Sequence, residues 1–206
     1  MTHFDNDTAV NDRPANERSI KDVFINGRTH RAFKDQPIAE DTLKHLYDLT
    51  KLGPSASNLC PMRISFVQTP EGKDKVMAAA AAGNRPKIAQ APVVAIIAHD
   101  TAFHRHVETL APHMDAEAYR QQDPAKLEQA AIENTWLQAG YFIIAARALG
   151  LDCGPMSGFD KAKIDAAFYQ ESTWRSEMLI NLGYGDDSQL YPRGERLGFD
   201  QACTML

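Results

Sequence analysis

The sequence predicts a single α+β domain, and three observations lead to that prediction. Segments with strand character are few, they stand between helices of unequal length, and they lack the regular strand–helix–strand spacing of a doubly wound sheet. The chain has 206 residues, enough for one compact domain or for one subunit of a larger unit. No repeat or linker divides residues 19–206, so they are treated as one domain.

The first elements follow a polar N-terminal segment. Residues 1–18 are rich in Asn and Asp and show no periodicity, so we expect a loose, flexible tail. Ser19 can then cap a short helix that runs to Asn26, and Gly27 should end it.

The next part of the chain alternates between helical and strand patterns. Apolar residues at helical spacing, an alternating β-prone run, an alanine-rich stretch and a continuous apolar run follow one another. The elements expected here are a helix over 40–52 stopped by Gly53-Pro54, a strand over 64–69, a helix over 73–82 and a central strand over 93–98.

The second half of the chain contains the clearest helix, over 125–149, which Gly150 should end. Its second half is apolar on nearly every side, so we expect it to be buried in the middle of the fold. Residues 100–124 mix prolines and histidines with scattered apolar residues and are expected to form a lid or a protruding helix. The remaining expectations are a helix from a cap at Asp160 to Phe168, a strand over 178–182 and an aperiodic segment over 189–206.

Composition excludes several classes of function. The net charge is 22 − 27 = −5, so nothing suggests a nucleic-acid partner. The three cysteines have no metal-like spacing, and the start of the chain lacks the pattern of a signal peptide, so a reduced, cytoplasmic protein is expected. The most apolar stretch, 137–149, is too short to span a bilayer and carries Arg147, so no membrane role is expected.

Several well-known site motifs are missing. No Gly-x-Gly-x-x-Gly follows a strand and no P-loop lysine motif is present. The serine of the segment 154–158 stands one place too late for a nucleophile elbow. His104, His106 and His113 lie close together but lack acidic or cysteine neighbours at ligand spacing, so surface or lid histidines are a better interpretation than a zinc site.

Five segments could carry chemistry, and each has a plain structural alternative. Arg28-Thr29-His30-Arg31 offers two guanidiniums and a hydroxyl to a phosphate, or forms a solvated basic turn. The loop over 53–58 lets a planar ligand approach its backbone, or merely ends a helix. Asn84 and Lys87 could reach a polar heterocycle, or belong to a surface loop.

The other two segments lie in the C-terminal half. The glycines of 154–158 free the backbone to present N–H groups at a fixed point, as a flavin would need, or form a rigid connection between two helices. Arg193 and Arg196 could complete a phosphate site, or be two surface arginines.

Taken together and in this order, these segments resemble the nitroreductase superfamily over roughly residues 18–206. The segments 150–160 and 179–186 are most similar to the branch named for malonic semialdehyde reductase of pyrimidine breakdown. The resemblance implies an α+β fold with a mostly antiparallel central sheet surrounded by helices. It also implies an intertwined homodimer with one FMN at each of two sites in the subunit interface.

The resemblance also implies roles for individual residues. Arg28, Thr29, His30 and Arg31 would contact the phosphate and ribityl chain, and Arg196, with Arg193 as a substitute for a missing lysine, would close the phosphate site. Asn84 and Lys87 would contact the pyrimidine edge of the flavin, where Lys87 would stabilise the charge of the reduced ring. The remaining contacts would come from Pro155, Met156, Ser157 and Gly158 near N5, and from Pro54, Ser55, Ser57 and Asn58 of the partner subunit.

Three departures from the common family pattern concern the pocket. Cys60-Pro61-Met62 stands where many members carry a glutamine and a tryptophan around the proline, Ser157 replaces a frequent acidic residue, and Gly194 replaces a lysine. The first two bear on the substrate more than on the flavin.

The implied activity is a ping-pong reduction in which NADH or NADPH donates the hydride. The small-molecule substrate expected from the resemblance is malonic semialdehyde, which would be reduced to 3-hydroxypropionate. The alternative is a generalist enzyme that reduces nitroaromatics and quinones. For the aldehyde, the 104–113 stretch or Arg105 could anchor the carboxylate. Two alternatives without turnover are a flavin-binding or ligand-sensing protein and an unliganded structural dimer.

Overall fold

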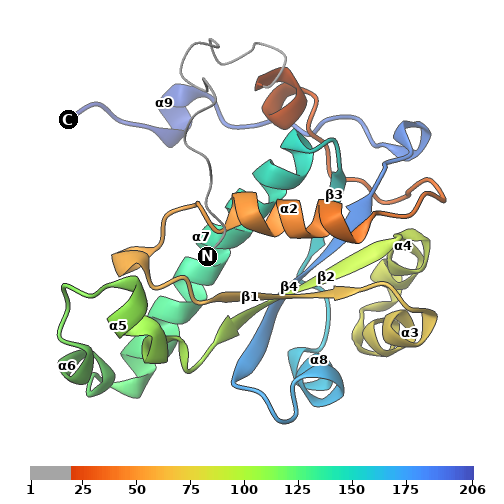
Figure 1. The fold of residues 1–206 in the computed structure, drawn as a ribbon. Coiled ribbons are helices and arrows are strands. Elements are labelled where there is room, and N and C mark those ends of the chain that lie inside the picture. The colour runs from red at the N-terminus through yellow and green to blue at the C-terminus, as the bar shows by residue number, and fades with distance from the viewer. Residues whose placement is uncertain (1–19) are drawn as a thin grey trace.

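The computed structural model describes residues 20–206, which form one four-stranded sheet with helices on both faces (Figure 1). The spatial order is β1-β2-β4-β3, and every neighbouring pair is antiparallel. The predicted α+β class with an antiparallel sheet is therefore confirmed. The strands are β1 (Met62–Val67), β2 (Val93–Asp100), β3 (Asp152–Met156) and β4 (Trp174–Gly183).

The helices differ greatly in length, from the three residues of η2 to the 25 residues of α7. The longer ones are α2 (Glu40–Thr50), α3 (Pro70–Ala79), α4 (Arg85–Gln90), α7 (Pro124–Ala148) and α8 (Lys161–Phe168). The short ones are η1 (Lys21–Ile25), η2 (Ala56–Asn58), η3 (Ala82–Asn84), η4 (Phe103–His106), α5 (Val107–Leu110), α6 (Ala116–Arg120), η5 (Asp187–Gln189) and α9 (Phe199–Ala202).

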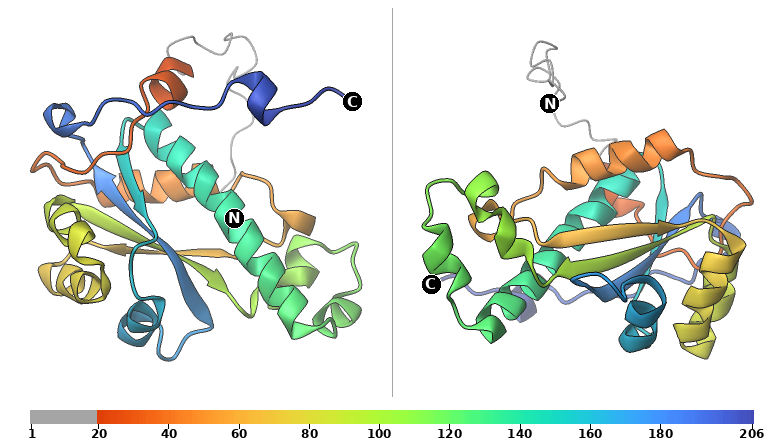
Figure 2. Two further views of the ribbon diagram at one scale, coloured as in Figure 1. Left: turned by 180° about the vertical axis from the view of Figure 1, so that it is seen from behind. Right: turned by 60° about the horizontal axis from the view of Figure 1, so that its bottom comes forward.

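Strand β2 lies at the centre of the fold and is buried at every position. Its Ala95 and Ile97 belong to the core under α2 and α7, whereas Val94 and Ile96 belong to the core under α3, α4 and α8. Both faces of the sheet are thus covered, as Figure 2 shows. The continuous apolar run of the predicted central strand follows from this double burial.

Helix α7 confirms the most distinct helical prediction. The Asp123 side chain accepts a hydrogen bond from Ala125 N at 3.0 Å, and Pro124 occupies the first turn, where a missing N–H has no cost. At the other end Gly150 has φ +78°, a conformation that glycine adopts without strain. Helix α8 is capped at its N-terminus in the same way, because the Asp160 side chain accepts a hydrogen bond from Lys163 N at 3.2 Å.

One expectation about α7 is wrong. Its second half is not surrounded by the fold, because Leu137, Tyr141 and Ile144 are 46%, 36% and 38% exposed. The opposite face, with Phe142 and Ala146, is fully buried against the sheet. In one chain, therefore, only one side of this apolar helix is covered.

One of the two interpretations of 154–158, a rigid connection between two helices, is also wrong. Residues 152–156 form strand β3, which pairs with β4 on one side and makes a parallel bridge from Cys153 to Thr29 on the other. Glycine and proline disfavour strands, so local propensity did not reveal it. A tertiary contact explains the glycine at position 154, since a Cβ there would lie 2.5 Å from His30 O.

The segment 100–124 folds into short helical pieces rather than one protruding helix. Phe103 and Val107 are buried in a small core with Leu127 and Ala131 at the start of α7. The predicted tail over 1–18 and the cap at Ser19 lie outside the described residues. Within residues 20–206 no helix has the length and apolar character needed to cross a membrane.

Candidate functional site

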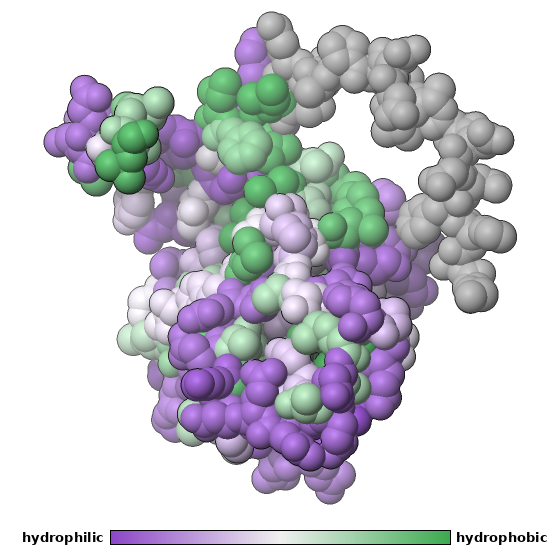
Figure 3. All heavy atoms as spheres, turned by 90° about the vertical axis from the view of Figure 1, so that its left-hand side faces the viewer, coloured by the Kyte–Doolittle hydropathy of each residue, from purple (hydrophilic) through white to green (hydrophobic). Residues whose placement is uncertain are grey.

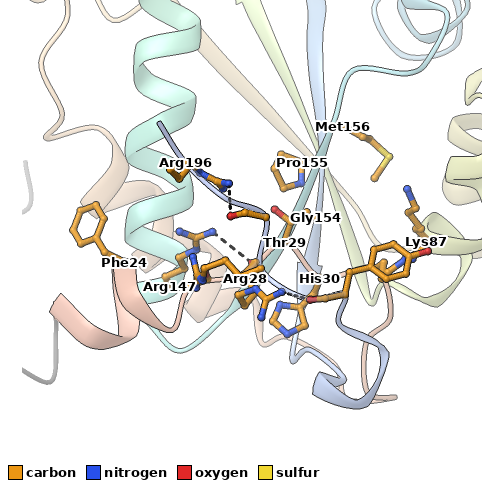
Figure 4. A pocket seen from close by; sticks show the side chains of 15 residues that line it. Phe24, Arg28, Thr29, His30, Lys87, Arg147, Gly154, Pro155, Met156 and Arg196 are labelled. Carbon is orange, nitrogen blue, oxygen red and sulfur yellow. Dashed lines mark hydrogen bonds between the residues drawn. The ribbon is translucent and has the colours of Figure 1, made fainter. Parts of the chain in front are cut away.

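A cavity of about 560 Å³ lies where three distant parts of the chain meet (Figure 4). The segment after η1, strand β3 and the segment after η5 each contribute to its wall, together with one side chain from α4 and one from α7. Its lining consists of Phe24, Gly27, Arg28, Thr29, His30, Arg31, Lys87, Arg147, Gly154, Pro155, Met156, Tyr191, Arg193, Gly194 and Arg196.

The cavity is strongly cationic. Five arginines and one lysine line it, and no Asp or Glu is found among its described lining residues. Like charges gathered without counter-ions favour an anionic ligand, and guanidiniums match the geometry of a phosphate.

Backbone carbonyl groups hold several of these guanidiniums in place. Arg147 donates to Val23 O at 3.1 Å, Arg193 donates to Gly27 O at 3.1 Å, and Arg28 donates to Tyr191 O. Because a guanidinium carries five N–H donors, each keeps others for a ligand. The cations are therefore positioned in advance without being neutralised.

The cations lie toward two ends of the cavity. Figure 4 shows Arg28, Arg147 and Arg196 toward one end and Lys87 toward the other, with Pro155 and Met156 between them. The site therefore suits a long ligand with a phosphate at one end and a polar group at the other.

The Lys87 end is held by a hydrogen-bonded chain. Lys87 Nζ donates to Asn84 Oδ1 at 3.0 Å, and Asn84 Nδ2 donates to Gly158 O at 3.0 Å. A Cβ on Gly158 would lie 2.9 Å from Asn84 Nδ2, so glycine permits this approach. Within residues 20–206, neither Ser157 N nor Gly158 N donates a backbone hydrogen bond, which leaves both N–H groups for a ligand.

The structure brings most of the predicted site residues together. The cavity is lined by Arg28, Thr29, His30, Arg31, Lys87, Pro155, Met156, Arg193 and Arg196, and the Asn84–Gly158 pair adjoins Lys87. Ser157 is exposed next to this pair.

The segment with Pro54, Ser55, Ser57 and Asn58 does not line this cavity in the single chain. It lies beside α5 and α7, where Asn58 Nδ2 donates to Leu110 O at 2.9 Å. Ser57, Asn58 and Cys60 have φ values of 51°, 56° and 43°, a region that non-glycine residues rarely occupy. The prediction that this loop serves a partner's flavin stays a prediction.

A second groove, of about 1000 Å³, borders that loop. Its lining includes Cys60, Met62, Arg63 and His106, and it is more apolar than the cationic cavity. Cys60 and Met62, which depart from the common family pattern, therefore line this groove.

Among the polar side chains that line the cavity, sequence reasoning missed two, Arg147 and Tyr191. Arg147 stands alone in an apolar helical stretch, and that isolation was a usable signal, because a buried charge needs a partner or a purpose. Tyr191 gave no signal; its ring lies 4.0 Å from Arg31 Cζ, at a distance typical of a cation–π contact.

Comparison with known proteins gives concordant results. Residues 26–184 match the model described as the nitroreductase family. A relative from Ralstonia nicotianae, provisionally named NADH dehydrogenase/NAD(P)H nitroreductase, is 45% identical over 194 residues, which are 94% of this chain and 100% of the relative.

Two solved structures share the fold. A nitroreductase-type protein of Bacillus subtilis has a TM-score of 0.83 at 21% identity, covering 92% of this chain and 100% of its own. Another, from Exiguobacterium sibiricum and described as a complex with FMN, has a TM-score of 0.80 at 19% identity, with 91% and 97% covered.

Proposed function

The chain belongs to the nitroreductase family, and on that premise we propose that it is an FMN-dependent NAD(P)H reductase. The observation that carries the proposal is the cavity lined by Arg28, Arg31, Lys87 and three further arginines without a carboxylate. FMN has the matching chemistry, with a phosphate at one end and a polar ring edge at the other.

The residues present fit this cofactor. Arg28, Arg31 and Arg196 would hold its phosphate, and Asn84 with Lys87 would meet the pyrimidine edge of its ring. The free N–H groups of Ser157 and Gly158 would face the ring near N5. The FMN complex of the Exiguobacterium protein supports the assignment by analogy of fold.

When bound, FMN supplies a hydride acceptor that NADH or NADPH reduces and that a second substrate then reoxidises, in a ping-pong order. The protein's own contribution is binding, orientation and charge. Lys87, held by Asn84 at 3.0 Å, keeps a positive charge beside the ring edge, where it stabilises developing negative charge.

A second copy of the chain would complete the site. The exposed apolar residues Leu137, Tyr141 and Ile144 of α7 form a face that one chain leaves uncovered. Figure 3 shows hydrophobic surface gathered in the upper part of one side of the molecule and mostly polar surface below it. The C-terminal segment, with Leu197 and Phe199 exposed, stands away from the body, as an intertwined homodimer would require (Figure 2).

The proposed substrate is a small aldehyde such as malonic semialdehyde, with 3-hydroxypropionate as product. The support is the sequence similarity of segments 150–160 and 179–186 to that branch. The alternative, a generalist reductase of nitroaromatics and quinones, is favoured by the name of the Ralstonia relative. Turnover of malonic semialdehyde and of a nitroaromatic, measured on one preparation, distinguishes them by the ratio of kcat/KM.

Anaerobic addition of NADH and of NADPH to the FMN-loaded protein tests the proposed function. We expect loss of the flavin absorption band within the turnover time, and its return when the second substrate is added. A bound flavin that neither nucleotide bleaches would identify a flavin-binding protein without turnover.

A further inference from the structure

The imidazole of His30 is buried between two carboxylates. Only 4% of the residue is exposed. His30 Nε2 lies 3.0 Å from Asp187 Oδ1 in a hydrogen bond, and His30 Nδ1 lies 3.2 Å from Asp152 Oδ1. The second contact has the distance of an ion pair without the alignment of a hydrogen bond.

This arrangement favours an imidazolium. A neutral imidazole that donates its one N–H to Asp187 would hold the lone pair of Nδ1 3.2 Å from a carboxylate oxygen of Asp152. The protonated ring donates an N–H to Asp187 and presents a positive charge to both carboxylates. Burial makes the unpaired alternative costly, because no bulk water can satisfy the ring.

The same residue joins β3 to the segment before η5. The backbone N–H of His30 donates to Cys153 O in β3 at 2.9 Å. The His30 ring packs where Gly185 has no side chain, and a Cβ at Gly185 would lie 2.1 Å from the ring. Asp152 Oδ2 accepts from Gly185 N at 2.8 Å, which links β3 to the segment that carries Asp187.

His30 stands between Arg28 and Arg31 in the chain, and both arginines line the cavity. Fixing the His30 ring therefore fixes the direction of the backbone from which the two guanidiniums project. If the ring no longer contacts Asp152 and Asp187, the two arginines are no longer oriented toward the ligand in the cavity.

We propose that His30, as an imidazolium clamped by Asp152 and Asp187, is a positioning residue that holds Arg28 and Arg31 ready for the anionic end of the ligand. The inference rests on the proposed function and deepens it, because it makes retention of that anion depend on one proton. The role is distinct from direct contact between the imidazole and the phosphate.

The charges around the ring favour the clamp. Asp152 faces it from β3 and Asp187 from η5, with Asp186 and Lys34 nearby and Arg28 and Arg31 on its own segment. The pKa of Asp186 is lowered, mainly by hydrogen bonds from Ser188 and in smaller part by Lys34 and His30.

The Asp187→Asn variant separates the clamp from simple electrostatics. Asp187 is 88% exposed, so the substitution should leave the fold intact. Removing a negative charge near a cationic cavity would by itself strengthen anion binding. The clamp predicts the opposite, a Kd for FMN at least about tenfold higher, since the neutral amide oxygen of asparagine accepts a weaker hydrogen bond from the imidazolium than a carboxylate does. Asp41→Asn, at an exposed position of α2, is the matched charge control and should leave the Kd unchanged.

Comparison with His30→Asn is the second measurement. Kd values for FMN and for inorganic phosphate are measured for both proteins at one fixed pH, because the phosphate group itself gains charge near pH 6. The native protein should bind both anions at least about tenfold more tightly than His30→Asn, since the variant lacks the charged ring that contacts Asp152 and Asp187.

The state of the ring is read directly from the ¹⁵N shifts of His30 in the ligand-free protein, which should show both nitrogens protonated. A neutral ring, or an Asp187→Asn protein that binds FMN as tightly as the native one or more tightly, overturns the clamp and leaves the proposed function intact. Phosphate binding that both substitutions weaken as expected, but without FMN binding, retains the clamp and overturns the proposed function. Binding of neither anion overturns both.

Discussion

At the scale of single residues, Lys87 is the side chain nearest to the proposed chemistry. Replacing it by alanine should slow reduction of bound FMN by NAD(P)H at least about tenfold, because a positioned cation beside developing negative charge is lost. Stopped-flow absorbance measures the rate. Lys75→Ala, at an exposed position of α3, is the control. Unchanged reduction kinetics would remove Lys87 from the mechanism.

Arg105 tests the aldehyde substrate at the same scale. If it anchors the carboxylate of malonic semialdehyde, Arg105→Ala should raise KM about tenfold or more with little change in kcat, since a charge-assisted hydrogen bond is lost in ground and transition states alike. Lys126→Ala serves as the control. An unaffected KM excludes this anchor.

Individual residues also show where sequence reasoning succeeds. Arg28, Arg31 and Lys87 could be identified because they stand in polar segments near the predicted ends of helices, and because the order of these segments resembles a known family. The structure places all three on one cavity. Arg147 and Tyr191 could not be assigned in the same way, because their link to the site exists only after α7 and the C-terminal segment have packed against η1.

At the scale of elements, the bulge in β4 creates a buried polar cluster. The register of β2 and β4 shifts between Ile97 and Ala98, and Glu177 of β4 has no partner there. Its carboxylate accepts from His99 Nδ1 at 2.9 Å, Lys161 Nζ at 2.7 Å and Trp136 Nε1 at 3.3 Å. Glu177 thus links α7, α8 and the sheet.

Glu177→Gln should lower the free energy of unfolding by about 3 kcal/mol, the range for breaking a buried ion pair. Burial alone would raise the pKa of Glu177, but hydrogen bonds from His99, Lys161 and Trp136 outweigh it and lower the pKa from 4.5 to about 2. The stabilisation is therefore present above pH 4.5 and is lost as the pH falls toward 2.

Urea unfolding of the native and Glu177→Gln proteins, near neutral pH and in acid, measures this effect. The difference between them should shrink as the pH is lowered through this window. Glu171→Gln, at an exposed turn, controls for the change of charge. A difference that is independent of pH would show that the carboxylate is not the stabilising group.

The elements also show which strands a sequence can reveal. The strands at the centre of the sheet were predictable because burial on both faces demands a continuous apolar run, as in residues 93–98 of β2. Strand β3 was not predictable, since Gly154 and Pro155 weaken strand propensity. The strand forms because of contacts that are distant in the sequence: Gly154 lies against His30, and β3 pairs with β4.

At the scale of the whole molecule, the uncovered face of α7 predicts association. Leu137→Glu should convert a dimer into a monomer, because a charge buried in an apolar interface has no partner. Sedimentation or light scattering measures the mass. Lys126→Glu, at the polar start of the same helix, should leave the dimer intact. A native protein that is monomeric at all concentrations would contradict the prediction.

The central claim is that the cationic cavity holds the phosphate of FMN. The most direct measurement is the amount of FMN released on denaturation of the purified, FMN-reconstituted protein, compared with a variant carrying both Arg28→Ala and Arg31→Ala. We predict close to one FMN per chain for the native protein and almost none for the variant, with both proteins folded by circular dichroism. Equal FMN content in the two would contradict the claim.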